Sequence, residues 1–218
     1  FAEGFGFITL LTLLPTYIET LGATGVVAGL FVTALGIGRT IAIFPVGWAA
    51  DRHDKRAVLL VSLLASAIAY GLFTVVETSL GFVVARTIQG LGIVGTGMVS
   101  LALVGDLATP NERARQIGTY NAWRMAAGVI GTLGAGALYD LHGFDPIFAT
   151  LVSLFVLVTI GVWLFVEADT TRISGFAFFD LALNERILTI TSFRAQYAVS
   201  VTLARNWVPI FVGLSVAR

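Results

Sequence analysis

Residues 47–56 read GWAADRHDKR and separate two long apolar segments. Six of these ten residues are ionisable, in a chain of 218 residues that is 57% hydrophobic and only 12% charged. Average soluble domains carry about twice that charged fraction. Together with a mean hydropathy of +0.91, this composition indicates a helical membrane protein, and it places the charged stretch in a short loop between two membrane helices.

Seven segments are expected to be membrane-spanning helices, because about 18 or more apolar residues with few charges predict such a helix. They are residues 1–21, 24–50, 57–76, 79–105, 115–138, 146–166 and 190–214. Pro15 is expected to kink the first span, and Tyr17 to anchor that end at the membrane interface. The sequence predicts an all-α, polytopic protein with a six-helix bundle over 1–166, a cytoplasmic connector with an interfacial helix over 167–189, and the first helix of a second bundle over 190–218.

Lysine and arginine are distributed unequally among the connections. Those after the second, fourth and sixth spans hold Arg52, Lys55, Arg56, Arg113, Arg115, Arg172 and Arg186, and those after the odd-numbered spans hold none. By the positive-inside rule, the even-numbered loops and the N-terminal end are expected in the cytoplasm, with the protein in the plasma or inner membrane of a cell. Phe1 and Arg218 adjoin apolar segments, so both chain ends are interpreted as cut.

The sequence lacks the residues and motifs that several classes of chemistry require. The chain has no cysteine, which excludes disulfides, thiol nucleophiles and thiolate metal sites within it. Its two histidines, His53 and His142, fall in predicted loops, so no metal site is expected. The sequence also has no HExxH, GxSxG or P-loop pattern. Neither an enzyme, a cofactor nor a nucleic-acid partner is therefore predicted.

Asp51 places a carboxylate at the negative end of its own helix dipole, which is unfavourable by roughly 0.3–1 kcal/mol. Gly47 lies one turn earlier on the same face and has no side chain to hold a neighbour away. The pair therefore predicts a helix end docked against another helix. Basic side chains of the loop can reach carboxylates at adjacent helix ends, with Asp106 as the expected partner. These side chains are Arg52, Lys55 and Arg56. Alternatively, the loop is a positive segment that only orients the protein.

The order of residues in this loop resembles the signature loop between helices 2 and 3 of the major facilitator superfamily. The family pattern is Gly-x-x-x-Asp-Arg-x-Gly-Arg-Arg. It is matched here by Gly47, Asp51, Arg52, Lys55 and Arg56. Asp54 replaces the usual glycine, which is a mild departure because aspartate tolerates the left-handed backbone conformation better than most residues.

Three further segments resemble the same family. RTIQG at 86–90 is similar to its helix-4 motif, and TPNERAR at 109–115 to its loop between helices 4 and 5. GTLGAG at 131–136 falls where efflux members carry Gly-Pro-x-x-Gly-Gly, and only Gly131 and Gly136 match. The resemblance implies two six-helix bundles with the substrate site between them. This chain would hold the first bundle, the connector and helix 7.

The resemblance also implies that the charged loop is a conformational latch. Its members are Gly47, Asp51, Arg52, Lys55, Arg56, Asp106 and Arg113. Asp51 would dock on the N-terminus of a helix in the second bundle when the cavity faces outward. In the family the helix-4 arginine, here Arg86, is linked to proton transfer.

Ionisable groups at membrane depth are costly, at least about 2.5–3.5 kcal/mol for a charge, so they are expected to face the bundle interior or a wet cavity. The predicted substrate and proton pathway consists of Glu3, Arg39, Arg86, Gln89, Asn121, Arg124 and Arg205. Glu3 is the candidate proton carrier, because burial favours its protonated form and a nearby arginine its ionised form. Plainer alternatives stay open. Arg86 and Gln89 can bind carbonyls of a neighbouring helix, Arg39 can pair internally, and Glu3 can lie at the interface.

The sequence therefore predicts a secondary active transporter that moves a small solute by alternating access, with proton-coupled efflux of drug-like or amphipathic compounds as the first choice. Four intramembrane arginines against one glutamate favour an alternative, uptake or exchange of an organic anion. A remoter alternative is a seven-helix receptor or retinal protein, although the only lysine, Lys55, lies in a loop. The expected partners are the lipid bilayer, the solute and protons, and the full-length protein is expected to be a monomer.

Overall fold

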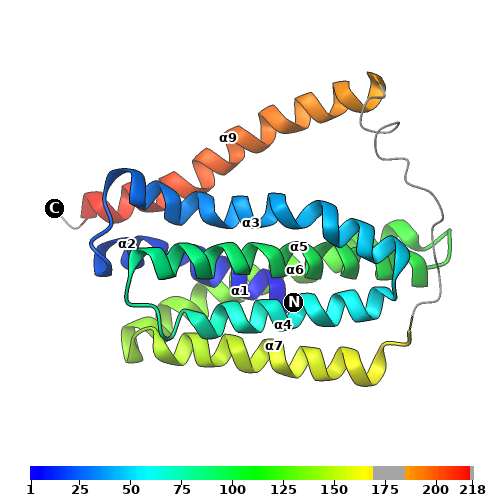
Figure 1. Ribbon diagram of the computed structural model, residues 1–218, viewed down its shortest axis with the longest axis horizontal. Coiled ribbons are helices and arrows are strands. Elements are labelled where there is room, and N and C mark those ends of the chain that lie inside the picture. Colours follow the sequence, from blue (N-terminus) through cyan, green and yellow to red (C-terminus); the bar gives the residue numbers. More distant parts are fainter. Residues whose placement is uncertain (169–184, 217–218) are drawn as a thin grey trace. The chain divides into compact units, whose positions relative to one another are not determined.

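The computed structural model describes residues 1–168 and 185–216. They belong to two compact units, residues 1–172 and 173–218, which are described separately. The first unit contains α1 (Ala2–Thr12), α2 (Leu14–Thr20), α3 (Gly25–Arg52), α4 (Lys55–Leu72), α5 (Ser79–Leu107), α6 (Arg113–His142) and α7 (Asp145–Phe165), and the second contains α9 (Glu185–Val216). The described residues form no strand, and the predicted all-α class is confirmed (Figure 1).

The first predicted span is interrupted at a single residue, Leu13, which separates two helices and marks the kink expected near Pro15. α1 ends at Thr12, and α2 restarts at Leu14 with Pro15 in its first turn. Proline has no backbone N–H and its ring clashes with the preceding turn, so it is tolerated where a helix begins and not in its interior. The chain therefore breaks just before Pro15.

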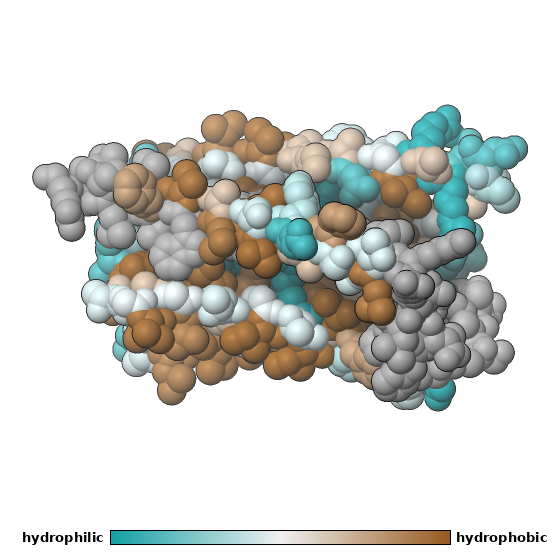
Figure 2. All heavy atoms as spheres, turned by 90° about the horizontal axis from the view of Figure 1, so that it is seen from above, coloured by the Kyte–Doolittle hydropathy of each residue, from teal (hydrophilic) through white to brown (hydrophobic). Residues whose placement is uncertain are grey.

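Four of the described helices are long and apolar enough to cross a membrane by length and composition, namely α3, α4, α5 and α7. α6 is also long, with 30 residues, but it carries charged side chains such as Arg115, Arg124 and Asp140. Large apolar side chains stay exposed on the helices, including Ile41, Ile68, Met125 and Leu157. Figure 2 shows apolar residues over much of one face and hydrophilic ones gathered toward one end. Soluble proteins rarely expose so much apolar surface, so the fold agrees with a multi-pass membrane protein.

α5 holds the first unit together. It packs against α3 on one side and α4 on the other, α4 in turn packs against α7, and α1 packs against α6 (Figure 1). The α3–α5 contact is very close. A methyl group built on Gly90 would overlap the carbonyl oxygen of Leu35, and one on Gly38 would overlap that of Thr87. Small residues let membrane helices approach in this way and gain van der Waals contact.

Tyr17 belongs to the core and is not an interfacial anchor, so that expectation is wrong. It is only 5% exposed. Its ring centroid lies 4.2 Å from that of Phe144 and 4.8 Å from that of Phe82. Tyr17 of α2 therefore packs on rings from α5 and from the start of α7. Aromatic pairs at such distances add about 0.5–1.5 kcal/mol each beyond area burial.

In the second unit, residues 185–216 form the single helix α9, which covers the predicted span 190–214. The side chain of Arg205 lies outside the described residues, as does most of the predicted connector, residues 169–184. The interfacial helix and the division into three parts therefore stay predictions.

Candidate functional site

One end of the first unit, here called the charged end, carries the loops 53–54 and 108–112. Lys55, at the start of α4, is only 5% exposed, and its Nζ lies 3.1 Å from Asp106 Oδ2 in α5. Arg113, at the start of α6, has its Nη2 3.7 Å from Asp106 Oδ1. The carboxylate of Asp106 thus joins the beginnings of α4 and α6 to the end of α5.

The other basic residues of the loop do not reach a carboxylate among the described residues. Arg56 donates a hydrogen bond to the carbonyl of Trp163 near the end of α7. The Arg52 guanidinium lies 5.3 Å from the ring centre of Trp48 on its own helix, a cation–π distance. Of the three basic residues expected to reach Asp106, the structure brings Lys55 to it and not Arg52 or Arg56. Its second partner among the described residues is Arg113, for which no such contact was predicted.

Asp54 serves as the N-cap of α4. Its Oδ1 accepts a hydrogen bond from the backbone N–H of Arg56 at 2.9 Å. Its φ of −61° is not left-handed, so the left-handed conformation offered to explain aspartate at this position is wrong. The physical reason is helix capping, since a carboxylate satisfies one of the free N–H groups at the start of a helix.

Asp51 and Gly47 show no docking within the first unit. The Asp51 side chain is exposed in the last turn of α3 and makes no hydrogen bond or ion pair with the described residues. A methyl group at Gly47 would meet only Met98 Cε, at an ordinary 3.7 Å. Any docking that requires these residues must therefore use another part of the full-length protein, and it stays a prediction.

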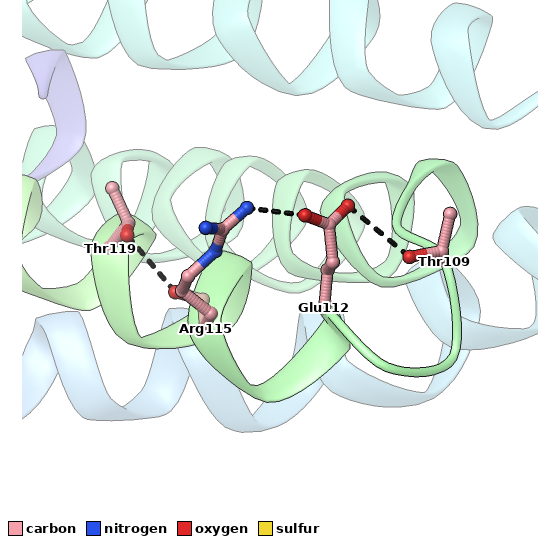
Figure 3. A network of polar contacts seen from close by, with 4 residues as sticks. All are labelled: Thr109, Glu112, Arg115 and Thr119. Atoms are coloured by element: carbon pink, nitrogen blue, oxygen red, sulfur yellow. Dashed lines mark hydrogen bonds and ion pairs between the residues drawn. The ribbon is translucent and has the colours of Figure 1, made fainter.

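The carboxylate of Glu112 accepts hydrogen bonds from side chains of the loop before α6 and of the first turn of α6 (Figure 3). Thr109 Oγ1 donates to Glu112 Oε2 at 3.2 Å, and Arg115 donates to the other oxygen of the same carboxylate. Thr119 Oγ1 donates to the Arg115 carbonyl at 3.0 Å. These contacts fix the start of α6, from which Arg113 reaches Asp106.

A second polar cluster lies in the core, centred on Arg86 of α5, which is 1% exposed. Arg86 Nη1 donates to Gln89 Oε1 at 2.8 Å, and its Nε donates to the Phe31 carbonyl of α3 at 3.4 Å. Gln89 Nε2 in turn donates to the Tyr70 hydroxyl of α4 at 2.9 Å. No carboxylate forms an ion pair with Arg86 among the described residues, so neutral groups alone hold this buried cation.

Tyr70 was not among the residues singled out from the sequence. The sequence feature that could have marked it is a tyrosine in the middle of an apolar helix. Buried tyrosines usually place their hydroxyl against a polar partner. The sequence cannot say that this partner is Gln89, because α4 and α5 meet only in the fold.

The third cluster joins α1 and α6. Arg124 Nη1 lies 3.7 Å from Glu3 Oε2, with the Glu3 side chain 12% exposed and that of Arg124 45% exposed. The two helices can approach because α1 carries glycine here, and a methyl group on Gly4 would overlap the Arg124 carbonyl. Further along the same contact, Thr9 Oγ1 donates to the Gly131 carbonyl at 3.2 Å.

The remaining predicted pathway residues are not brought together. Arg39 is exposed on α3 and forms no hydrogen bond or ion pair with the described residues, so the internal partner expected for it is not found there. Asn121 is half-buried on α6, one turn before Arg124.

A cavity of about 90 Å³ adjoins Glu3, and Phe1 and Ala2 at the start of the chain also line it. Its polar lining also includes Thr96 and Ser100 of α5 and Tyr120 of α6. Sequence reasoning missed the two hydroxyl residues of α5, because such side chains are common in membrane helices and usually bond to their own backbone.

Residues 1–217 match the family described as the Major Facilitator Superfamily. The chain belongs to this superfamily. A solved structure of PepTSo, a transporter of the POT family, superimposes on this chain with a TM-score of 0.67 and 17% sequence identity. The superposition covers 99% of this chain and 51% of PepTSo. At that identity the likeness shows the fold alone.

Curated relatives are other members of the Major Facilitator type. The multidrug resistance protein MdtG of Serratia proteamaculans is 30% identical over 171 residues, which cover 74% of this chain and 41% of the relative. MdtG of Rahnella sp. is 28% identical over 179 residues, covering 80% and 43%. The uncharacterized MFS-type transporter MJ1560 of Methanocaldococcus jannaschii is 26% identical over 157 residues, covering 72% and 40%. The chain thus spans less than half the length of these relatives. Family and relatives are of the membrane-transporter kind and not enzymes.

Proposed function

We propose that the chain is part of a secondary active transporter that moves a small solute across a cell membrane by alternating access. Its proposed activity is proton-coupled efflux of drug-like or amphipathic compounds. Membership of the superfamily supports the transporter class. The name "multidrug resistance protein" of several relatives supports a drug-like solute.

The ion pair between Glu3 and Arg124 carries the proposal of proton coupling. Its 3.7 Å separation is longer than the roughly 2.7–2.9 Å of a tight charge-assisted hydrogen bond, so the pair is only loosely closed. Protonation of Glu3 would remove the negative charge that faces Arg124 and weaken the contact of α1 with α6. A group whose charge controls a contact between helices is suited to link proton binding to a conformational change.

The test uses the full-length protein in proteoliposomes with an imposed pH gradient and a lipophilic cationic dye as the solute. We expect Glu3→Gln to abolish gradient-driven dye transport while gradient-free exchange of the dye continues. Glu19→Gln is the matched control, because Glu19 is exposed in α2 at the opposite end. Undiminished uphill transport by Glu3→Gln would show that the proton is carried elsewhere.

Transport of an organic anion is a second candidate, and a specific observation favours it. Arg86 and Arg39 have no carboxylate partner among the described residues. The planar guanidinium group binds carboxylates in two-point fashion. In the same vesicles, uptake of an organic acid that weakens with Arg39→Gln, together with no transport of the dye, would favour this alternative.

The latch and the orientation are also proposals. We propose that Asp51 docks on a helix of the second bundle and that the charged end faces the cytoplasm of a plasma or inner membrane. The basic residues of its loops support that orientation by the positive-inside rule. Labelling of His53→Cys by an impermeant reagent only from the inner side would agree with it, and labelling from outside would reverse it. The proposed partners are lipid, the solute and protons, with the full-length protein as a monomer.

A further inference from the structure

We infer that Tyr70 is a positioning residue, whose hydroxyl links the position of α1 to the hydrogen bonds of the buried Arg86 guanidinium during transport. The inference rests on the proposed proton coupling at Glu3. It adds the side chain that connects the helix of Glu3 to the polar cluster around Arg86.

The Tyr70 hydroxyl lies against the backbone of α1 at Gly6. A methyl group built on Gly6 would overlap the hydroxyl oxygen and come within 2.8 Å of Tyr70 Cζ. Gly6 is buried, and Tyr70 of α4 is 0% exposed. Such a close approach of another group to a helix backbone requires a residue without a Cβ atom. Any larger side chain at this position of α1 would therefore displace the phenol.

Two further aromatic side chains hold the ring of Tyr70 in place. Its centroid lies 5.2 Å from that of Phe155 in α7 and 6.3 Å from that of Phe73 at the end of α4. Phe155 is 0% exposed and Phe73 is 3% exposed. Protein interiors are packed so densely that a side chain cannot shift without moving its neighbours. A displacement of α1 is therefore passed on to the hydroxyl, because the ring has no room to swing aside.

The hydrogen bonds that connect Tyr70 to Arg86 have a fixed direction. Gln89 Oε1 accepts from Arg86 Nη1 at 2.8 Å, and Gln89 Nε2 donates to the Tyr70 hydroxyl oxygen at 2.9 Å. The amide cannot be turned over, because a guanidinium group only donates and so needs the Gln89 oxygen. All three side chains are at most 1% exposed. A broken bond therefore leaves a buried polar group unsatisfied, which is unfavourable.

The contact with Gly6 connects Tyr70 to the proposed proton carrier. Glu3 lies about one turn before Gly6 on α1, and its Oε2 is 3.7 Å from Arg124 Nη1. Protonation of Glu3 removes the negative charge that faces Arg124 and weakens the contact of α1 with α6. A resulting shift of α1 reaches the Tyr70 hydroxyl and changes the hydrogen bond that it accepts. The hold of neutral groups on Arg86 changes with it, and by linkage the state of Arg86 affects the proton affinity of Glu3.

The first experiment measures coupling in the full-length protein, in proteoliposomes with an imposed pH gradient, a lipophilic cationic dye and a trapped pH indicator. Tyr70→Phe keeps the ring and removes only the hydroxyl. We expect fewer protons moved per dye molecule and gradient-driven transport slower by about tenfold, a usual size for coupling between two sites. Gradient-free exchange of the dye should continue. Ser66→Ala is the matched control, because Ser66 lies one turn earlier on α4, is 0% exposed and donates to the Ser62 carbonyl of its own helix.

The number of protons moved per dye molecule separates coupling from a purely structural role, because unfolded molecules move neither and leave this ratio unchanged. A normal ratio in Tyr70→Phe would overturn the inference. That result would leave the proposed proton coupling standing, since the latter depends on the separate behaviour of Glu3→Gln. If the unaltered protein showed no gradient-driven transport of the dye, the proposed function and the inference would both be wrong.

The second experiment reaches the same contact from α1. Gly6→Ala places a methyl group on the Tyr70 hydroxyl, so we expect a lower thermal stability in detergent and fewer protons moved per dye molecule. In the double variant with Tyr70→Phe, the overlapping hydroxyl is gone. Its stability should therefore recover toward that of Tyr70→Phe alone, while the ratio of protons to dye stays low.

Gly161→Ala on α7 is the matched control, because no atom lies within 4 Å of its added methyl group. It should leave both the stability and the ratio unchanged. A double variant that is no more stable than Gly6→Ala would show that the methyl group does not meet the hydroxyl, and the link between α1 and Tyr70 would be excluded.

Discussion

The ammonium nitrogen of Lys55 lies 3.1 Å from a carboxylate oxygen of Asp106, and the Lys55 side chain is only 6% exposed. A lysine so deeply buried is stable only with a partner, and this contact fastens the first turn of α4 to the last turn of α5. The charged loop therefore has a structural task inside the first unit, apart from any latch to a second bundle.

Lys55→Met is expected to destabilise the protein by about 1–2 kcal/mol. Removing one partner of a fully buried pair costs about 3–5 kcal/mol, but Asp106 is 38% exposed and water can solvate it. Thermal unfolding in detergent gives the change. In the double variant with Asp106→Asn, the loss should be smaller than the sum of the single losses. Simple additivity would mean that the two residues do not stabilise each other.

Asp51→Asn is expected to leave the thermal stability unchanged and to slow transport. The side chain is exposed and has no partner among the described residues, so folding of the first unit does not depend on it. A carboxylate at a helix N-terminus contributes about 1 kcal/mol, which corresponds to a rate change of about fivefold. Glu77→Gln, in the loop 73–78 at the opposite end, is the control. Transport by Asp51→Asn at the normal rate would rule out the latch.

Gln89→Leu is expected to destabilise more than Tyr70→Phe. The first change takes an acceptor from the buried guanidinium of Arg86, and hydrogen bonds to charged groups contribute about 1.5–3 kcal/mol. The second takes an acceptor from a neutral amide, and neutral hydrogen bonds contribute about 0.5–1.5 kcal/mol. Thermal unfolding in detergent shows which of the two variants is less stable. The reverse order would mean that Arg86 finds a substitute partner, such as water.

Gly90→Ala is expected to destabilise by about 1–3 kcal/mol, the usual cost of overpacking. The added methyl group would overlap the Leu35 carbonyl and come within 2.9 Å of the Arg39 backbone nitrogen, and neither backbone atom can move alone. Gly97→Ala is the matched control on α5, because no atom lies within 4 Å of its added methyl group. The control should be neutral or more stable by up to about 1 kcal/mol, given the better helix propensity of alanine. Equal effects at both positions would argue against the close α3–α5 contact.

The sequence by itself determined the helical class, the family and the approximate helix bounds, because hydrophobic length and turn residues act locally along the chain. It also marked Glu3, Arg86 and Arg124 as costly at membrane depth, a cost that depends on residue type alone. Only the tertiary structure decided which partner each of them meets. Arg124 faces Glu3, Arg86 lies with Gln89 and Tyr70, and Arg39 stays exposed.

The same distinction explains why the burial of Tyr17 and of the Thr96 hydroxyl does not follow from the sequence. Tyr17 is buried because aromatic rings far away in sequence, such as that of Phe144, pack against it. Thr96 stands out only once the helices pack, because its hydroxyl is then buried without a hydrogen-bond partner among the described residues. A residue's type fixes what its burial would cost, whereas the packing of distant helices fixes whether it is buried and against what.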